Sequence, residues 1–167
     1  MPFKTCWTRR QTRLITGLPA AALLLAAALP LLAQAPTLTV APVPTVRTQK
    51  GAVAVVTLRA SLPQGYHANS NTPTDAYLIP LSLKWTGGPL RVDAVTYPKA
   101  SLEKYAFSEK PLSVVTGEFI LTTKFQVPAD APNGAAAQTG TLRFQACNDR
   151  MCFAPKAVPV SVAVEIQ

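Results

Sequence analysis

Alternating apolar and polar residues recur in short runs along most of this chain. The clearest run covers residues 158–166, where valine or isoleucine occupies every second position. A period of two places these side chains on one face of a β-strand. Similar runs occupy residues 53–60, 81–85, 90–97, 119–127 and 142–146, and Pro or Gly ends several of them. The pattern predicts seven or eight strands, and no segment has a convincing helical period.

Turn-forming residues between these runs favour an antiparallel β-sandwich, so we expect an all-β fold of about 7–9 strands. A chain of 167 residues accommodates one domain of ordinary size. We place that domain at residues 51–167. Residues 36–50 are rich in Pro, Thr and Val and are expected to form an extended lead-in, and residues 129–138 a loop of small residues.

Residues 1–35 have the pattern of a secretory signal peptide. Four basic residues come first, an apolar stretch follows over residues 14–32, and Ala33-Gln34-Ala35 has the small residues of a cleavage site. We expect cleavage after about Ala35 and a periplasmic location. Cys6 leaves with this segment, so Cys147 and Cys152 are the cysteines that the mature chain keeps.

A permanent membrane anchor is the alternative for this segment, because about 20 apolar residues span a bilayer. Pro19 and Pro30 interrupt the apolar stretch, and the small-residue site follows it at once, which favours cleavage. Export by the twin-arginine route is a minor alternative, because the residues after Arg9-Arg10 match that signal poorly.

The formal net charge of +8 is divided unevenly along the chain. Four of the 16 basic residues lie in the first 35, so the mature chain keeps 12 basic and 8 acidic residues. No basic run and no alternation of basic with aromatic residues remains, which argues against nucleic acid as a partner. Hydrolytic catalysis has little support, because the chain has one histidine and no G-x-S-x-G elbow.

Two long polar segments, residues 65–80 and residues 99–111, carry aromatic side chains. Long loops on a rigid sandwich are frequent sites of function. Surface loops whose aromatic rings cover the core account for the same residues equally well. These segments are therefore candidates for a functional role, but the residues themselves do not decide it.

Cys147 and Cys152 are separated by four residues that include the turn formers Asn148 and Asp149. A predicted strand leads into Cys147, and Pro155 keeps the returning segment at an edge or outside the sheet. Such a turn can supply the Cα separation of roughly 4.4–6.8 Å that a disulfide requires. In an oxidising compartment we expect this pair to be able to join.

The residues leave two interpretations of this pair open. A structural disulfide would close a loop of only six residues, which stabilises the chain by about 2 kcal/mol through loop-closure entropy. An exchangeable disulfide near a surface loop is accessible to an attacking thiolate. Arg150 would stabilise a thiolate here, and Asp149 would oppose it. The spacing is not the C-x-x-C of thioredoxin-like proteins.

Three segments together resemble the N-terminal periplasmic domain of the thiol:disulfide interchange protein DsbD. They are QACNDRMCFAP around the cysteines, GYHANSNTPTDAYLIP, and a YP…F loop between them, and the resemblance extends over roughly residues 50–167. It implies an immunoglobulin-like sandwich with two redox cysteines and no cofactor. It also implies that the domain passes reducing equivalents to periplasmic thioredoxin-fold proteins by thiol–disulfide exchange.

The resemblance assigns different roles to the two cysteines. Cys152 would form the mixed disulfide with a partner, and Cys147 would resolve it. The best-known members space their cysteines slightly wider, so we expect the local loop to differ. This chain stops after the domain, without the family's membrane region and thioredoxin-like domain. We therefore expect a separate membrane protein to be the electron donor, and no membrane span once the signal is removed.

Aromatic residues near the pair also have counterparts in the family. An aromatic ring on a cap loop shields the cysteines there, and the best match is Phe107, with Tyr105 as its neighbour. Tyr66 falls where the family has a tyrosine near the site. His67 and Asn69 replace other aromatic residues at that place.

Two functions of other classes remain as alternatives. A copper-binding protein could use His67, Cys147, Met151 and Cys152 as soft ligands, although a single His and this Cys spacing do not form a zinc pattern. His67 alone is more often a hydrogen-bonding loop residue or a modulator of thiolate pKa than a ligand. A non-redox binding module would keep the disulfide as a permanent crosslink, since β-sandwiches serve many functions.

Overall fold

The computed structural model describes residues 36–167, so the predicted signal peptide at residues 1–35 lies outside the described residues. The described part of the chain contains twelve strands and no helix. The strands are β1 (Thr39–Val40), β2 (Val46–Thr48), β3 (Val53–Ser61), β4 (His67–Asn69), β5 (Ser82–Gly87), β6 (Arg91–Thr96), β7 (Ser101–Glu103), β8 (Leu112–Thr116), β9 (Glu118–Gln126), β10 (Gly134–Phe144), β11 (Ala146–Cys147) and β12 (Lys156–Ile166).

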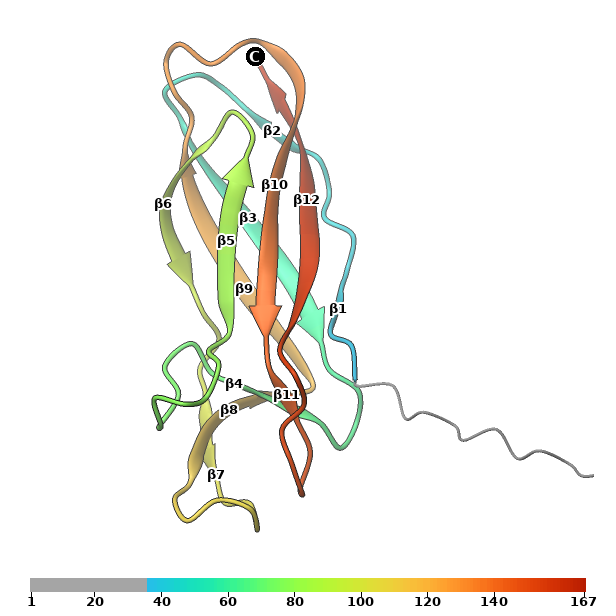
Figure 1. Ribbon diagram of the computed structural model, residues 1–167. Coiled ribbons are helices and arrows are strands. Elements are labelled where there is room, and N and C mark those ends of the chain that lie inside the picture. Colours follow the sequence, from blue (N-terminus) through green and yellow to red (C-terminus); the bar gives the residue numbers. More distant parts are fainter. Residues whose placement is uncertain (1–35) are drawn as a thin grey trace, which may run out of the picture. The chain divides into compact units, whose positions relative to one another are not determined.

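The strands form three four-stranded sheets. Sheet A has the order β1-β3-β9-β6, sheet B the order β2-β12-β10-β5, and sheet C the order β11-β4-β8-β7. Sheets A and B are the two layers of a sandwich, and sheet C lies at one end of it (Figure 1). Neighbouring strands pair antiparallel, except that β2 runs parallel to β12. The predicted immunoglobulin-like all-β sandwich is confirmed.

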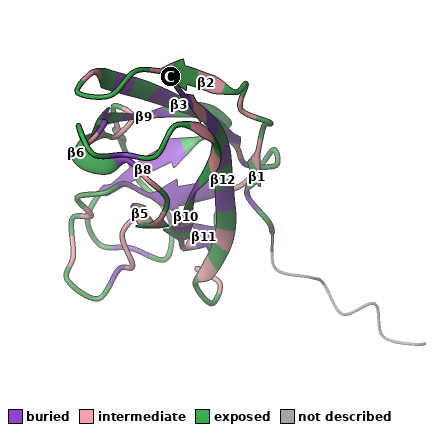
Figure 2. Ribbon diagram, turned by 90° about the horizontal axis from the view of Figure 1, so that it is seen from above, coloured by how far each residue is buried: buried purple, intermediate pink, exposed green. Residues whose placement is uncertain are grey.

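The long strands follow the alternation in the sequence. Seven strands have five residues or more, in agreement with the predicted seven to nine, and the other five have two or three. Along β12, buried residues alternate with exposed ones toward its C-terminal end, which the banded colouring of Figure 2 shows. The indole of Trp85 on β5 donates to Thr123 Oγ1 on β9 at 3.0 Å and meets Phe125 edge-on, so these side chains join the two layers.

Residues 129–138 were expected to be a loop, but β10 already begins at Gly134. Its first residues pair with the end of β12, from Gly134 with Ile166 to Gln138 with Val162. Backbone pairing to a well-defined strand outweighs the weak β-propensity of alanine. In the predicted lead-in at residues 36–50, β1 pairs with β3, β2 pairs with β12, and Leu38 is buried.

Sheet C is built from the segments that looked like functional loops. Strand β4 lies in the segment 65–80, β7 lies in the segment 99–111, and β8 follows it directly. Gly117 adopts a φ of 57°, a conformation that favours glycine, and it separates β8 in sheet C from β9 in sheet A. Among residues 36–167, no helix is long and apolar enough to cross a membrane.

Candidate functional site

The two faces of sheet C have different neighbours. Ala68, Val115 and Ala146 belong to the main hydrophobic core. Side chains one position along each strand point to the opposite face. His67 and Cys147 lie on that second face, where they stand directly opposite each other in the antiparallel β4–β11 pair. Sheet C is therefore anchored to the core by one face and carries the cysteine site on the other.

Cys147 and Cys152 are joined by a disulfide bond, which confirms that the turn brings them together. Their Cα atoms are 3.9 Å apart, slightly closer than the usual lower limit of about 4.4 Å. The two residues also form an isolated antiparallel bridge, and the Phe153 amide donates to the Ala146 carbonyl at 2.8 Å. The disulfide thus crosslinks the base of a short hairpin that extends from the end of the sandwich (Figure 1).

Asn148 shapes the turn between the cysteines. Its Oδ1 accepts hydrogen bonds from the amides of Arg150 and Met151, both at 2.9 Å. Its own amide donates to the Met151 carbonyl at 2.9 Å. Asp149 and Arg150 are exposed at this turn, so both predicted neighbours of the pair lie on its solvent side. The side-chain hydrogen bonds explain why asparagine suits this position.

The two sulfur-bearing residues differ in exposure. Cys147 is fully buried at 0% relative exposure, whereas Cys152 is half-buried. Both residues of β11 are buried, and Figure 2 colours that strand accordingly. The difference arises because Cys147 belongs to a paired strand of sheet C, while Cys152 lies on the returning arm of the hairpin. A reagent from solution therefore meets Cys152 first.

Gln145 fastens this hairpin to the neighbouring segment, a role that the sequence did not reveal. Its Oε1 accepts hydrogen bonds from Asn69 Nδ2 at 3.0 Å and from the Ile79 amide at 3.1 Å. Its Nε2 donates to the Phe153 carbonyl at 3.1 Å. Asn69, a predicted site neighbour, is fully buried and also donates to the Ile79 carbonyl at 3.1 Å. Phe153 follows Cys152, so these contacts hold the half-buried cysteine in place.

Tyr105 covers the second face of sheet C. Its ring stacks on that of His67 with 4.0 Å between centroids and 15° between planes. Phe107 stacks in turn on Tyr105 at 5.6 Å and 18°. Tyr105 rather than Phe107 is thus the ring that contacts the residue opposite Cys147. Phe107 is 38% exposed and forms an outer layer.

Glu103 fixes Tyr105 over His67. The Tyr105 hydroxyl donates to Glu103 Oε2 at 2.7 Å, and Ser101 Oγ donates to Oε1 at 2.8 Å. These hydrogen bonds lower the pKa of Glu103, so the carboxylate is charged at neutral pH. Burial and the Glu103 contact raise the pKa of Tyr105. Burial lowers the pKa of His67, and the Glu103 charge opposes that shift in part.

A cleft of about 490 Å³ opens beside the disulfide hairpin, and Tyr66, His67, Glu103, Tyr105 and Asp149 are among its lining residues. Tyr66 also meets Phe153, with 6.0 Å between ring centroids. The cleft therefore brings together residues from both long polar segments and from the cysteine turn. Such a hollow can receive a side chain or a short extended segment of another molecule.

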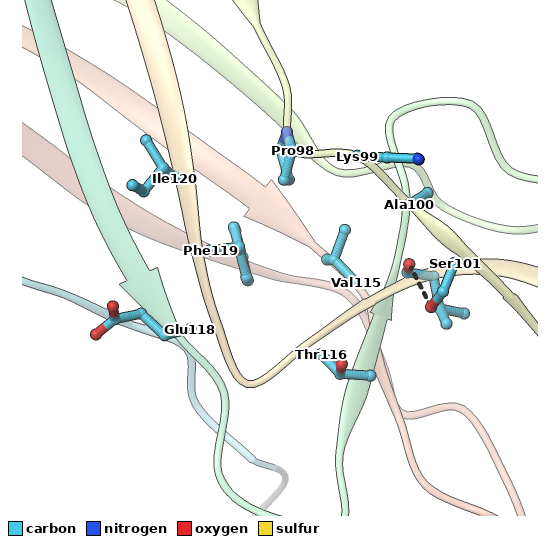
Figure 3. A pocket seen from close by; sticks show the side chains of 10 residues that line it. Pro98, Lys99, Ala100, Ser101, Val115, Thr116, Glu118, Phe119 and Ile120 are labelled. Carbon is cyan, nitrogen blue, oxygen red and sulfur yellow. Dashed lines mark hydrogen bonds between the residues drawn. The ribbon is translucent and has the colours of Figure 1, made fainter.

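A larger hollow of about 620 Å³ lies between the start of β9 and the β7–β8 pair (Figure 3). Its lining includes Lys99 and Glu118 but no cysteine or histidine, and Ser101 Oγ donates within it to the Val114 carbonyl at 3.5 Å. The cleft beside the hairpin is smaller, but His67, Glu103 and Asp149 of the cysteine turn line it. We therefore take that cleft and the Cys147–Cys152 pair as the candidate site.

Metal ligation was one alternative for His67 and the cysteines. Among residues 36–167, no group of three or more His, Cys, Asp or Glu side chains is arranged so that it could hold a metal ion. Both cysteine sulfurs are bonded to each other. The bonded pair thus offers no thiolate ligand in this state.

The shielding by Tyr105 can be measured on the reduced thiol of Cys147. In a Cys6→Ser, Cys152→Ser chain, we expect Tyr105→Ala to speed iodoacetamide alkylation of Cys147 by about two- to tenfold, because a ring contact contributes about 0.5–1.5 kcal/mol. Tyr77→Ala is the matched control, since Tyr77 is 73% exposed. Equal alkylation rates in the two variants would show that Tyr105 does not shield the cysteine.

Comparisons with known proteins reveal similarity in backbone but not in sequence. No protein-family model and no curated protein sequence matches the chain. The N-terminal periplasmic domain of ScsB from Proteus mirabilis matches with a TM-score of 0.49 and 14% identity, over 72% of this chain and 44% of that one. The reduced DsbD N-terminal domain of Neisseria meningitidis matches with a TM-score of 0.46 and 16% identity, over 74% and 85%. The seventh ScaB type I cohesin of Pseudobacteroides cellulosolvens matches with a TM-score of 0.43 and 11% identity, over 78% and 92%. This chain spans less than half of the ScsB chain. All three similarities concern the arrangement of the strands alone.

Proposed function

We propose that this protein is a periplasmic thiol:disulfide oxidoreductase that exchanges disulfides through Cys147 and Cys152. One observation carries the proposal: a disulfide that closes a short hairpin pairs a buried sulfur-bearing residue with a half-buried one. A bond across five positions contributes little to a sandwich that has its own core. Its position on an exposed hairpin suits reaction with another protein.

The difference in exposure supports one order for the two steps of exchange. The reduced protein attacks a partner disulfide through the Cys152 thiolate, which forms a mixed disulfide and releases one partner thiolate. Cys147 then attacks Cys152 Sγ, which releases the second partner thiolate and closes the bond described here. Two electrons pass to the partner, and the two cysteines are oxidised. The half-buried residue is suited to the first step and the buried one to the second.

The partners that fit this chemistry are proteins with their own exposed dithiols or disulfides, and thioredoxin-fold proteins of the periplasm are the class we propose. The cleft beside the hairpin offers them a docking place that Tyr66 and Asp149 help to line. A membrane protein would supply the electrons. Tyr66, Phe107 and Arg150 would contact the partner around the hairpin.

The reduction potential of the Cys147–Cys152 pair tests this function. We expect the full chain with Cys6→Ser to equilibrate with glutathione buffers at a potential above about −300 mV, the value below which structural disulfides typically lie. The redox state is read by alkylation and mass spectrometry. A potential below that value, together with no exchange with thioredoxin, would instead identify a structural disulfide in a non-redox binding module.

A further inference from the structure

His67 is the chain's one histidine, and its environment is unusual for an imidazole. The side chain is 2% exposed, and its Nε2 atom is buried without a hydrogen-bond partner among the described residues. A buried nitrogen without a partner costs free energy, on the order of 1–3 kcal/mol. The sequence indicated a loop residue, but His67 instead begins β4 in the middle of sheet C. We therefore look for a hydrogen-bond partner that His67 Nε2 gains at another stage of the reaction.

The register of sheet C identifies that partner. His67 and Cys147 are directly opposite in the β4–β11 pair, and opposite residues of an antiparallel pair project to the same face with Cβ atoms about 4.5–5.5 Å apart. Both side chains are buried there, and Tyr105 covers the imidazole. When the disulfide is reduced, the Cys147 thiol therefore opposes an imidazole away from bulk water.

The other ionisable groups around His67 are all anionic or neutral. Glu103 on β7 interacts with it electrostatically and accepts the Tyr105 hydrogen bond. Tyr66 and Asp149 lie on the same cleft, from the segment before β4 and from the cysteine turn. No Lys or Arg is among the described residues that line this cleft, and Arg150 is exposed at the cysteine turn, so a protonated His67 is the cation directly opposite a Cys147 thiolate. Burial lowers the pKa of His67, so the ring is neutral at pH 7 and able to accept a proton.

We propose that His67 accepts the thiol proton of reduced Cys147 and so generates the thiolate that expels the bound partner, an inference that rests on the proposed exchange function. A buried thiol is a poor nucleophile, because burial raises its pKa. Transfer of the proton to His67 Nε2 leaves an imidazolium opposite a thiolate. The Cys147 thiolate attacks Cys152 Sγ, the Cys152–partner bond breaks, and the departing partner thiolate takes up the proton from His67.

The resolving step can be observed with the aromatic disulfide DTNB as the partner. In reduced full chain with Cys6→Ser, Cys152 attack releases one coloured thionitrobenzoate and Cys147 attack releases the second. We expect His67→Gln to slow the second release by about 100-fold at pH 7, the lower range for loss of a general base, and to leave the first unchanged. The rate of the second release should recover as pH rises toward the ionisation of the free thiol.

Tyr77→Phe is the control, because Tyr77 is 73% exposed and neither lines the cleft beside the hairpin nor lies opposite Cys147. We expect it to leave both releases unchanged at pH 7. If His67→Gln leaves the second release as fast as in the parent, His67 is not the proton acceptor, although the exchange function stands. If the parent chain gives no first release, or fails to exchange with thioredoxin, the proposed function itself is wrong.

A second measurement needs no variant at His67. Because the chain has one histidine, its imidazole signals can be followed by NMR without overlap when no histidine tag is used. We expect the pKa of His67 to be below its ordinary value in the oxidised protein and to change on reduction, when the Cys147 thiol becomes its hydrogen-bond partner. An identical titration in both redox states would overturn the proposal.

Discussion

We expect the Cys147→Ser chain to accumulate stable mixed disulfides through Cys152, and the Cys152→Ser chain to form almost none. Serine at position 147 removes the sulfur that would displace a bound partner, so the reaction stops at the mixed disulfide. In Cys152→Ser the remaining thiol is 0% exposed, and a partner can reach it only after sheet C opens locally. An opening free energy of about 3 kcal/mol would slow that reaction roughly 100-fold.

The measurement uses both variants in the Cys6→Ser background, because Cys6 is the third cysteine of the chain. Each reduced variant is mixed with a thioredoxin that keeps only its attacking cysteine, joined to thionitrobenzoate as a mixed disulfide, and the adducts are resolved on non-reducing gels and identified by mass spectrometry. The Cys147→Ser, Cys152→Ser double variant is the control. Trapping by Cys152→Ser alone would reverse the two roles, and trapping by neither variant would argue for a structural disulfide.

The sandwich was predictable because its long strands have one face on the core and one in solvent. Strands β3, β9 and β12 alternate in burial over nine or eleven residues, and that alternation is present in the sequence. The hydrophobic effect acts on each position of such a strand in turn, so a period of two is enough to identify it. The cysteine pair was also predictable, because only Cys147 and Cys152 remain once the segment with Cys6 is removed.

Sheet C was not predictable in the same way. All three residues of β4 and the first four residues of β8 are buried, because both faces of these strands are covered. Burial on both faces removes the alternation, and strands of three residues are too short to show it. His67 and Asn69 were consequently interpreted as loop residues, whereas both are buried strand residues.

The contacts of the site were also beyond the sequence, because they join distant positions. Gln145 and Asn69 are 76 residues apart, and only the pairing of β11 with β4 brings them together. Tyr105 reaches His67 because β8 pairs with β4 on one side and with β7 on the other, and Tyr105 follows β7. A polar residue between buried neighbours, such as Gln145 between Phe144 and Ala146, is the signal that could have drawn attention to it.

Replacing Gln145 by leucine should destabilise the fold far more than the same replacement at an exposed glutamine. Leucine keeps the volume but removes both side-chain hydrogen bonds to Oε1 and the one from Nε2. The Ile79 amide and the Phe153 carbonyl lose these partners in a partly buried place. We expect the free energy of unfolding to fall by about 2–4 kcal/mol, since each polar group left unpaired costs about 1–3 kcal/mol. Urea denaturation of the oxidised protein, followed by tryptophan fluorescence, measures this loss.

Gln126→Leu is the matched control, because Gln126 Nε2 also donates to two backbone carbonyls, of Gly51 and Ala52, but at an exposed position. Water replaces those hydrogen bonds, so we expect a change within about 1 kcal/mol. If the two leucine variants lose equal stability, burial does not strengthen the Gln145 contacts. If Gln145→Leu loses more stability than Gln126→Leu, the partly buried hydrogen bonds of Gln145 support the fold, and one of them is to Phe153, the residue after Cys152.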